Sequence, residues 1–353
     1  MLRMKQVDRR VCCAPMMDWT DRHCRYFLRG FSPSVLLYTE MITSAAILRG
    51  DRARLLAFDP EEHPVALQLG GSEPSDLAKA ARAGAEVGYD EINLNCGCPS
   101  DRVSSGSFGA CLMREPARVA ECVAAMKASV TVPVTVKMRI GVVDGGKRES
   151  SRAIAQVSEQ DVAALHEFVT RIAQAGCDAA IVHARKAVLG GLSPKENREI
   201  PPLRYDVVRE LKTAFPTLPV IVNGGFRDAD AALEALVGCD GVMLGREAYH
   251  RPMVLADLDA ALRDSERGIA PAPPSREAML DRMARYAARE LARGERLPSI
   301  TRHMLGLYAG EPGARDYRRR LSEGAREAGA GADLIRRSAP AAATQGFENS
   351  TYI

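Results

Sequence analysis

The sequence contains no hydrophobic run long enough to cross a membrane. A membrane-spanning helix needs about 18 or more consecutive apolar residues, and no stretch of the 353 residues approaches that length. Residues 1–5 are basic, but the apolar run and cleavage site of a signal peptide do not follow them. We therefore expect a cytoplasmic protein with no membrane partner.

The nine cysteines lack the paired spacing of a metal site or a disulfide framework. Cys12 and Cys13 lie in an apolar run, whereas Cys111, Cys122 and Cys177 stand alone. No repeated C-x-x-C pair and no Cys/His spacing predicts zinc. We expect no metal, and we expect most of the thiols to be small buried side chains in a reducing compartment.

Aromatic residues make up only 5% of the chain, which leaves few candidates for stacking on nucleic-acid bases. Trp19 and Tyr26 are the candidates, and a structural role is the alternative for each. Lysine is absent from residues 276–337, where 14 arginines and nine acidic residues leave a surplus of five positive charges. This segment suits a phosphate-rich partner, although a solvated, ion-paired helix face would have a similar composition.

Eight runs rich in Val, Ile and Leu alternate with helix-like stretches, a pattern typical of βα units and a parallel sheet. The predicted strands cover residues 11–15, 35–41, 65–69, a run that begins at 89–92, 134–139, 179–184, 219–223 and 241–244. Eight such units over about 250 residues predict a (β/α)8 TIM barrel.

The composition changes after Leu262, where glycine, prolines and charged residues replace the βα pattern. We predict a catalytic barrel domain at residues 1–262 and a linker at 263–275. A small all-helical domain at 276–338 and a disordered tail at 339–353 complete the predicted organisation.

Chemically versatile side chains occur where the predicted strands end, the edge at which barrels place their active sites. They are Met16, Gln68, Asn93, Asn95, Lys137, Arg139, His183, Asn223 and Arg246. Glycines accompany the last two strand ends, as Gly224, Gly225 and Gly245, and barrels often bind a phosphate there. No G-x-G-x-x-G follows a strand, so a phosphorylated cofactor across the barrel mouth is favoured over a dinucleotide-binding domain.

Flavin mononucleotide (FMN) fits these strand ends. Lys137 can place a cation near the N1–O2 edge of the flavin, Gln68 can offer an amide, and residues 15–17 can offer backbone groups. A thiol opposite the ring would serve as an acid. In the stretch 93–100, NLNCGCPS, Cys98 is the predicted acid and Cys96 is predicted to pack.

Several motifs together resemble the tRNA-dihydrouridine synthases. They are APMMDWTDR at 14–22, NLNCGCPS at 93–100, KMR at 137–139, HARK at 183–186 and NGG at 223–225. LSPKENR at 192–198 and ITRHMLGL at 300–307 are similar to the A subfamily in particular. The resemblance covers residues 10–329, and its motifs are long, ordered and specific.

The resemblance implies an FMN-bearing barrel followed by a helical domain. It also implies NADPH-dependent reduction of the C5–C6 double bond of uridines in the tRNA D-loop, at positions 20 and 20a for the A subfamily. A hydride would pass from FMN N5 to C6 of the uracil, and Cys98 would donate a proton to C5. We expect a monomer.

The resemblance also implies contacts for the cofactor and for tRNA. For FMN they are Pro15, Met16, Met17, Gln68, Lys137, His183, Asn223, Gly224, Gly225, Gly245 and Arg246. For tRNA they are Asn95, Lys195, Arg198, Arg315 and Arg318.

The sequence leaves open the role of one segment and two alternative functions of the protein. The segment 142–160 is longer than the corresponding segment usually is in the family. It is either a solvated insertion or an extra contact to tRNA. The alternative enzyme is an FMN barrel that acts on a free small molecule, which would not need an arginine-rich helical domain. The alternative outside enzymes is an RNA-binding protein on a barrel scaffold, which would not need Cys98, Lys137 and His183.

Overall fold

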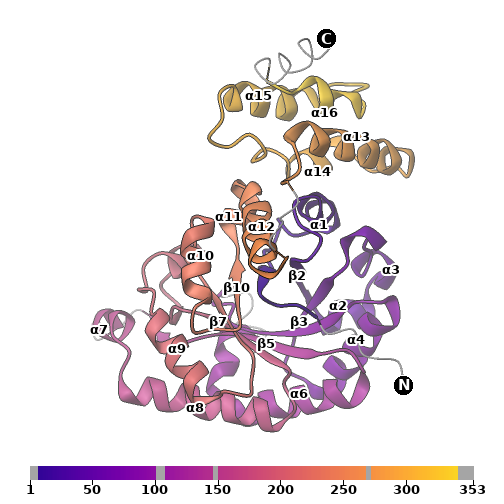
Figure 1. Ribbon diagram of the computed structural model, residues 1–353. Coiled ribbons are helices and arrows are strands. Elements are labelled where there is room, and N and C mark those ends of the chain that lie inside the picture. The colour runs from indigo at the N-terminus through magenta and orange to yellow at the C-terminus, as the bar shows by residue number, and fades with distance from the viewer. Residues whose placement is uncertain (1–6, 101–107, 146–149, 268–271, 341–353) are drawn as a thin grey trace. The chain divides into compact units, whose positions relative to one another are not determined.

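Eight parallel strands form a closed barrel in the computed structural model, which describes residues 7–100, 108–145, 150–267 and 272–340 (Figure 1). Around the barrel the order is β1-β10-β9-β7-β5-β4-β3-β2. The bounds are β1 Val11–Cys13, β2 Leu36–Thr43, β3 Val65–Gly70, β4 Glu91–Cys96, β5 Val134–Arg139, β7 Ala179–His183, β9 Val220–Asn223 and β10 Gly241–Leu244. The predicted (β/α)8 barrel is confirmed.

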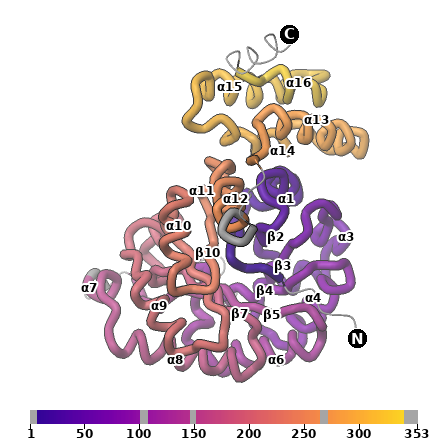
Figure 2. The backbone as a smooth tube through the Cα atoms, viewed as in Figure 1, coloured from indigo at the N-terminus to yellow at the C-terminus, as the bar shows by residue number. Residues whose placement is uncertain are grey.

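Helices connect the strands along the chain, as the backbone trace shows (Figure 2). Those between β2 and β10 are α2 Ser44–Arg49, α3 Arg52–Leu55, α4 Pro74–Val87, α6 Pro116–Ser129, α7 Ser150–Ala155, α8 Glu159–Gln174, α9 Tyr205–Ala214 and α10 Ala229–Leu236, with 3₁₀ turns η1 Pro60–Glu62, η2 Gly109–Arg114 and η3 Glu196–Arg198. Local chemistry sets their ends. Proline opens α4 and Gly88 closes it with a φ of 110°, a left-handed conformation that glycine adopts without strain. Ser158 and Asp161 form a capping box at the start of α8.

Two short strands lie outside the barrel and form a sheet of their own. β6 Val142–Asp144 pairs in parallel with β8 Ala187–Leu189. Part of the long segment 142–160 is therefore ordered sheet, and its residues 146–149 lie outside the described residues. The Lys186 ammonium donates to the Ala153 carbonyl at 2.8 Å and pairs with Asp161 at 2.7 Å, which ties the end of this segment to the loop after β7.

By its contacts the chain divides into two compact units, one of Met1–Asp18 with Ser34–Gly245 and one of Trp19–Pro33 with Arg246–Ile353. The second unit contains α1 Arg22–Arg29, α11 Arg246–His250, α12 Met253–Arg267, α13 Arg276–Ala292, α14 Leu297–Thr301, α15 Ala314–Gly324 and α16 Asp333–Arg337. A C-terminal helical region is thus present, as predicted. The domain limits at 262 and 276 stay a prediction, although residues 263–267 are the end of α12. In the predicted tail, residues 341–353 lie outside the described residues.

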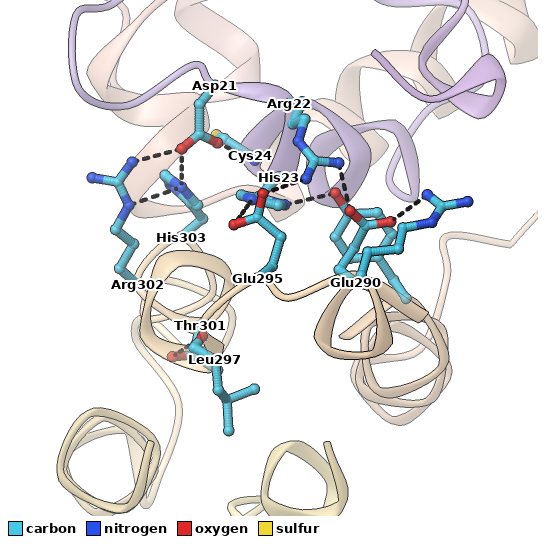
Figure 3. Close-up of polar contacts among 12 residues, drawn as sticks. Asp21, Arg22, His23, Cys24, Glu290, Glu295, Leu297, Thr301, Arg302 and His303 are labelled. Carbon is cyan, nitrogen blue, oxygen red and sulfur yellow. Dashed lines mark hydrogen bonds and ion pairs between the residues drawn. The ribbon is translucent and has the colours of Figure 1, made fainter. Parts of the chain in front are cut away.

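Ion pairs join the start of α1 to α13 and to the residues on either side of α14, more than 250 residues later in the chain (Figure 3). The Asp21 carboxylate, at the N-cap of α1, pairs with Arg302 at 2.6 Å and with His303 at 3.0 Å. Arg22 pairs with Glu290 at 2.5 Å and with Glu295 at 2.6 Å. Burial acts to raise the pKa of Asp21, but hydrogen bonds and charge from His303 and Arg302 outweigh it and hold that pKa well below its usual value.

No helix within the described ranges is long and apolar enough to span a membrane.

Candidate active site

Cys98 lies just beyond the carboxyl end of β4, in a turn held by a side chain of the strand itself. Asn95 Oδ1 accepts hydrogen bonds from the backbone N–H groups of Gly97, at 3.1 Å, and Cys98, at 3.0 Å. The Cys98 carbonyl accepts from the N–H of Ala110 in η2 at 2.9 Å. This turn leaves the Cys98 thiol half-buried, with its sulfur 3.5 Å from the Ser100 hydroxyl.

The two thiols of this stretch have different environments. Cys96 is fully buried, and burial raises its pKa well above the usual value. A buried neutral thiol of this kind is inert, so the prediction that Cys96 packs is confirmed. All nine cysteines are described and none forms a disulfide; six are buried, and Cys98, Cys111 and Cys239 are half-buried.

Cationic side chains gather at the ends of β5 and β7. Burial, then the charge of Arg139, lowers the pKa of Lys137 to about 7. Burial lowers the pKa of Arg139 to about 9, and nearby Arg198 and Arg185 act in the same direction. His183 is buried and its pKa lies well below the usual value, first through burial and then through Arg139 and Lys137. Next to burial, the positive charge of Arg139 is the main influence that lowers the pKa of Lys137 and of His183, so an anion would be stabilised here.

Hydrogen bonds orient two of these cations. Lys137 Nζ donates to Asn223 Oδ1 at 3.0 Å, and Asn223 Nδ2 donates to the Met243 carbonyl at 2.7 Å. Arg139 donates to the Gly97 carbonyl at 3.2 Å and to the carbonyls of Lys186 and Asn197, which both belong to the connection between β7 and α9. Arg139 therefore links the Cys98 turn to that connection. Sequence reasoning noted Arg139 at a strand end but did not assign it to the site.

The predicted phosphate-binding glycines have the backbone that such a cradle requires. Gly224 and Gly225 have φ values of 118° and 80°. A Cβ at Gly224 would come within 2.5 Å of His183 Cδ2, so only glycine allows this close approach. Gly245 lies beside Met16, whose sulfur would be 3.6 Å from a Cβ at that position. The structure thus brings strand ends β1, β7, β9 and β10 to one edge of the barrel.

The loop after β1 presents the predicted flavin-facing residues. Pro15 and Met16 are half-buried, and Met17 is 56% exposed. Asp18 has a φ of 64°, which is uncommon for a residue other than glycine, and its N–H donates to the Glu40 carboxylate. Such strain often lies at functional sites.

Lys195 and Arg198 are exposed on the loop after β8. Asn197 between them is fully buried and holds the loop in place: its Oδ1 accepts from the Val188 N–H at 2.7 Å, and its Nδ2 donates to the carbonyls of Val188 and Leu192. Sequence reasoning missed Asn197. The feature of the sequence that could have identified it is the asparagine within the LSPKENR motif.

Gln68 is buried on β3 in the first unit, whereas three other predicted residues belong to the second unit. Arg246 is exposed and is the first residue of α11. Arg315 and Arg318 are exposed on α15, and in the described part of the chain neither side chain has an ion pair. Arg319 on the same helix, by contrast, pairs with Asp316 at 3.1 Å.

The two candidate stacking residues both pack on other rings of the second unit. Trp19 stacks on Tyr249 with centroids 4.4 Å apart, and Tyr26 stacks on Tyr286 with centroids 3.9 Å apart. Arg282 lies over the Tyr26 ring, 4.2 Å from its centroid. The structural alternative therefore holds for Tyr26, which is buried.

Comparison with known proteins points to one family. A family described as dihydrouridine synthase (Dus) matches residues 12–344. A protein of Xanthomonas axonopodis pv. citri named tRNA-dihydrouridine(20/20a) synthase is 54% identical over 326 residues, 92% of each chain. Proteins of the same name are 52% identical in Shewanella oneidensis, covering 94% of this chain and 93% of theirs, and 53% identical in Pseudomonas aeruginosa, covering 90% of each. These similarities run through both units.

Proposed function

Since the chain belongs to the dihydrouridine synthase family, we propose that it reduces the C5–C6 double bond of tRNA D-loop uridines, U20 and U20a, with bound FMN and with NADPH as reductant. The relatives named for uridines 20 and 20a support the substrate. The observation that carries the proposal is the half-buried Cys98 thiol at the same barrel edge as the half-buried Lys137 and the buried Arg139.

The residues present fit FMN. The charges around Lys137 and Arg139 are positive and suit an anionic phosphate or a reduced flavin. Gly224 and Gly225 provide a left-handed backbone, and His183 and Leu203 pack so closely against it that a Cβ would collide with them. The first-unit residues that would hold the cofactor are Pro15, Met16, Met17, Gln68, Lys137, His183, Asn223, Gly224, Gly225 and Gly245, and Arg246 stays a predicted contact.

When bound and reduced, FMN would supply the hydride that C6 of the uracil receives. Cys98 would hold the proton for C5, because its thiol is partly accessible while Cys96 is fully buried. Lys195 and Arg198, exposed on one loop, would contact the phosphates. Asn95 stays a predicted tRNA contact; its buried amide is bonded to Gln68 and to the turn of Cys98. A uracil in folded tRNA must leave its stack to reach such a pocket.

Reconstitution tests the proposed function directly. The purified protein with FMN and NADPH is expected to convert unmodified tRNA transcript to product with dihydrouridine at positions 20 and 20a, as mapped by mass spectrometry. Without FMN or without NADPH, product should be absent. A protein that cannot be loaded with FMN, or one that reduces only free pyrimidines and enones, would contradict the proposal.

Replacing Arg315 and Arg318 together with alanine is expected to weaken tRNA binding about tenfold and to reduce the salt dependence of binding by about two ion equivalents, because each guanidinium would neutralise one phosphate. Binding is measured by filter retention across a salt series. Arg319→Ala is the matched control, since that guanidinium is already paired with Asp316. NADPH-dependent flavin reduction should not change in either variant. Unaltered tRNA affinity in the double variant would remove α15 from the tRNA site.

A further inference from the structure

Buried side chains of the barrel include an apolar cluster and a separate series of polar groups on and beside β4. The apolar cluster comes mainly from β1, β2, β7, β9 and β10, and its members are Cys12, Ala14, Leu36, Tyr38, Ala66, Ala179, Ile181, Ile221 and Met243. In contrast, β4 carries Glu91, Asn93 and Asn95 at alternate positions, so all three side chains point to the same face of the strand. Burying three polar side chains in a row is costly unless each has hydrogen-bond partners.

The partners form a continuous series that begins at Glu91, at the amino end of β4. Glu91 is fully buried and pairs with Arg9 at 2.7 Å. Its Oε1 accepts from the Tyr38 hydroxyl at 2.6 Å and from the Thr135 hydroxyl at 2.5 Å. Thr135 Oγ1 in turn accepts from Asn93 Nδ2 at 2.9 Å.

The series continues to the turn that carries Cys98. Asn93 Oδ1 accepts from Gln68 Nε2 at 2.7 Å, and Gln68 Oε1 accepts from Asn95 Nδ2 at 2.9 Å. Asn95 Oδ1 then accepts from the N–H groups of Gly97 and Cys98. The register of the barrel strands favours these contacts. Asn93 on β4 lies opposite Gln68 of the neighbouring β3 and opposite Thr135 of the neighbouring β5.

Chemistry at the two ends sets one direction for every bond. A carboxylate can only accept, so Thr135 must donate its hydroxyl proton to Glu91 and accept from Asn93. The backbone N–H groups at the far end can only donate, so Asn95 must turn its oxygen toward them. Both ends demand the same orientation of the three amides between them, and no amide has to be assigned arbitrarily.

Resting on the proposed function, we propose that Glu91 is a positioning residue: it orients a hydrogen-bond relay through Thr135, Asn93, Gln68 and Asn95 that holds the turn of Cys98 in place. Glu91 itself is at the opposite end of β4 from the thiol. The same relay determines which atoms Gln68 presents, since its Nε2 donates to Asn93 and its Oε1 accepts from Asn95.

Thr135→Val tests the relay, because it removes one buried hydroxyl with little change of shape. The readout is amide hydrogen exchange of Gly97 and Cys98, followed by NMR in the folded protein. Their N–H groups donate to Asn95 Oδ1, so loosening that acceptor should speed their exchange roughly tenfold. Thr135→Ser keeps the hydroxyl and should restore exchange to the wild-type rate.

Tyr38→Phe is the matched control. It also removes a hydroxyl that donates to Glu91 Oε1, but Tyr38 does not lie between Glu91 and Asn93. Exchange at Gly97 and Cys98 should therefore stay at the wild-type rate in this variant. Equal acceleration in Tyr38→Phe and Thr135→Val would show general destabilisation and would overturn the relay.

The remaining outcomes separate the relay from the proposed function. Wild-type exchange at both amides in a folded Thr135→Val protein would overturn the relay. If that variant does not fold, Asn93→Ser, which breaks the next link, replaces it with the same expected and contrary results. In tRNA turnover, Thr135→Val should lower kcat and leave KM for tRNA unchanged. A wild-type protein that forms no dihydrouridine would refute the proposed function alone, since the exchange measurements need no turnover.

Discussion

Cys98→Ala is expected to lower dihydrouridine formation about 10²- to 10⁴-fold, the range that a positioned general acid contributes. The variant loses the proton donor for C5 but keeps the turn, because Asn95 accepts from backbone N–H groups and not from the thiol. FMN binding and tRNA binding should therefore stay close to wild type. Single-turnover reaction of the prereduced enzyme with tRNA transcript measures the chemical step separately from flavin reduction.

A matched cysteine makes this result specific. Cys239 lies two residues before β10, is also half-buried and forms no disulfide. Cys239→Ala should retain wild-type turnover. If Cys98→Ala turns over at the wild-type rate under single-turnover conditions, Cys98 is not the proton donor, whatever the fate of the other assignments.

Lys137→Met is expected to weaken FMN binding about 10- to 100-fold, because a hydrogen bond to a charged group contributes about 1.5 to 3 kcal/mol. Methionine keeps much of the length of the side chain and removes its charge. Fluorescence titration of the apoprotein with FMN measures the loss. Lys127→Met is the control, since Lys127 is a half-buried lysine of α6 that pairs with Asp178 at 2.8 Å. Equal affinity in Lys137→Met and wild type would remove Lys137 from the cofactor site.

The pH dependence of FMN binding follows from the same lysine. Burial and Arg139 lower the pKa of Lys137 to about 7 in the protein without cofactor. A bound anion would raise that pKa, so binding above pH 7 would take up a proton and weaken as the pH rises, by up to about tenfold per unit. Below pH 7 the ammonium is already charged, and this dependence should disappear. Lys137→Met should lose the slope above pH 7, and a flat wild-type profile would contradict the assignment.

Regular local patterns explain how much of the fold could be predicted. The predicted limits of β10, residues 241–244, match the structure because this strand is a buried apolar run with clear ends. Those of β5, residues 134–139, also match, because apolar and polar residues alternate along it with the period of a strand. The fourth strand was less clear. It begins at Glu91 rather than Tyr89 and continues to Cys96, since polar side chains at alternate positions hide a strand whose partners are themselves polar.

Some residues of the candidate site could likewise be predicted from the sequence, and others could not. Glycines and reactive side chains at strand ends predicted Cys98, Lys137 and His183, because a parallel barrel brings the carboxyl ends of its strands to one edge. The role of Arg139 and the burial of Asn197 could not be read from the sequence. They depend on backbone carbonyls of other loops, which carry no residue-specific signal.

The sequence by itself determined the barrel, the family and the chemical groups at its mouth, because periodic burial and motif spacing are local properties of the chain. Only the tertiary structure decided that α1 belongs with the C-terminal helices, through Asp21 and Arg22, whose partners lie far away in the sequence. It also decided the direction of the relay from Glu91 to the Cys98 turn. That direction depends on which donor meets which acceptor across three neighbouring strands, and pairing across strands exists only once the barrel has closed.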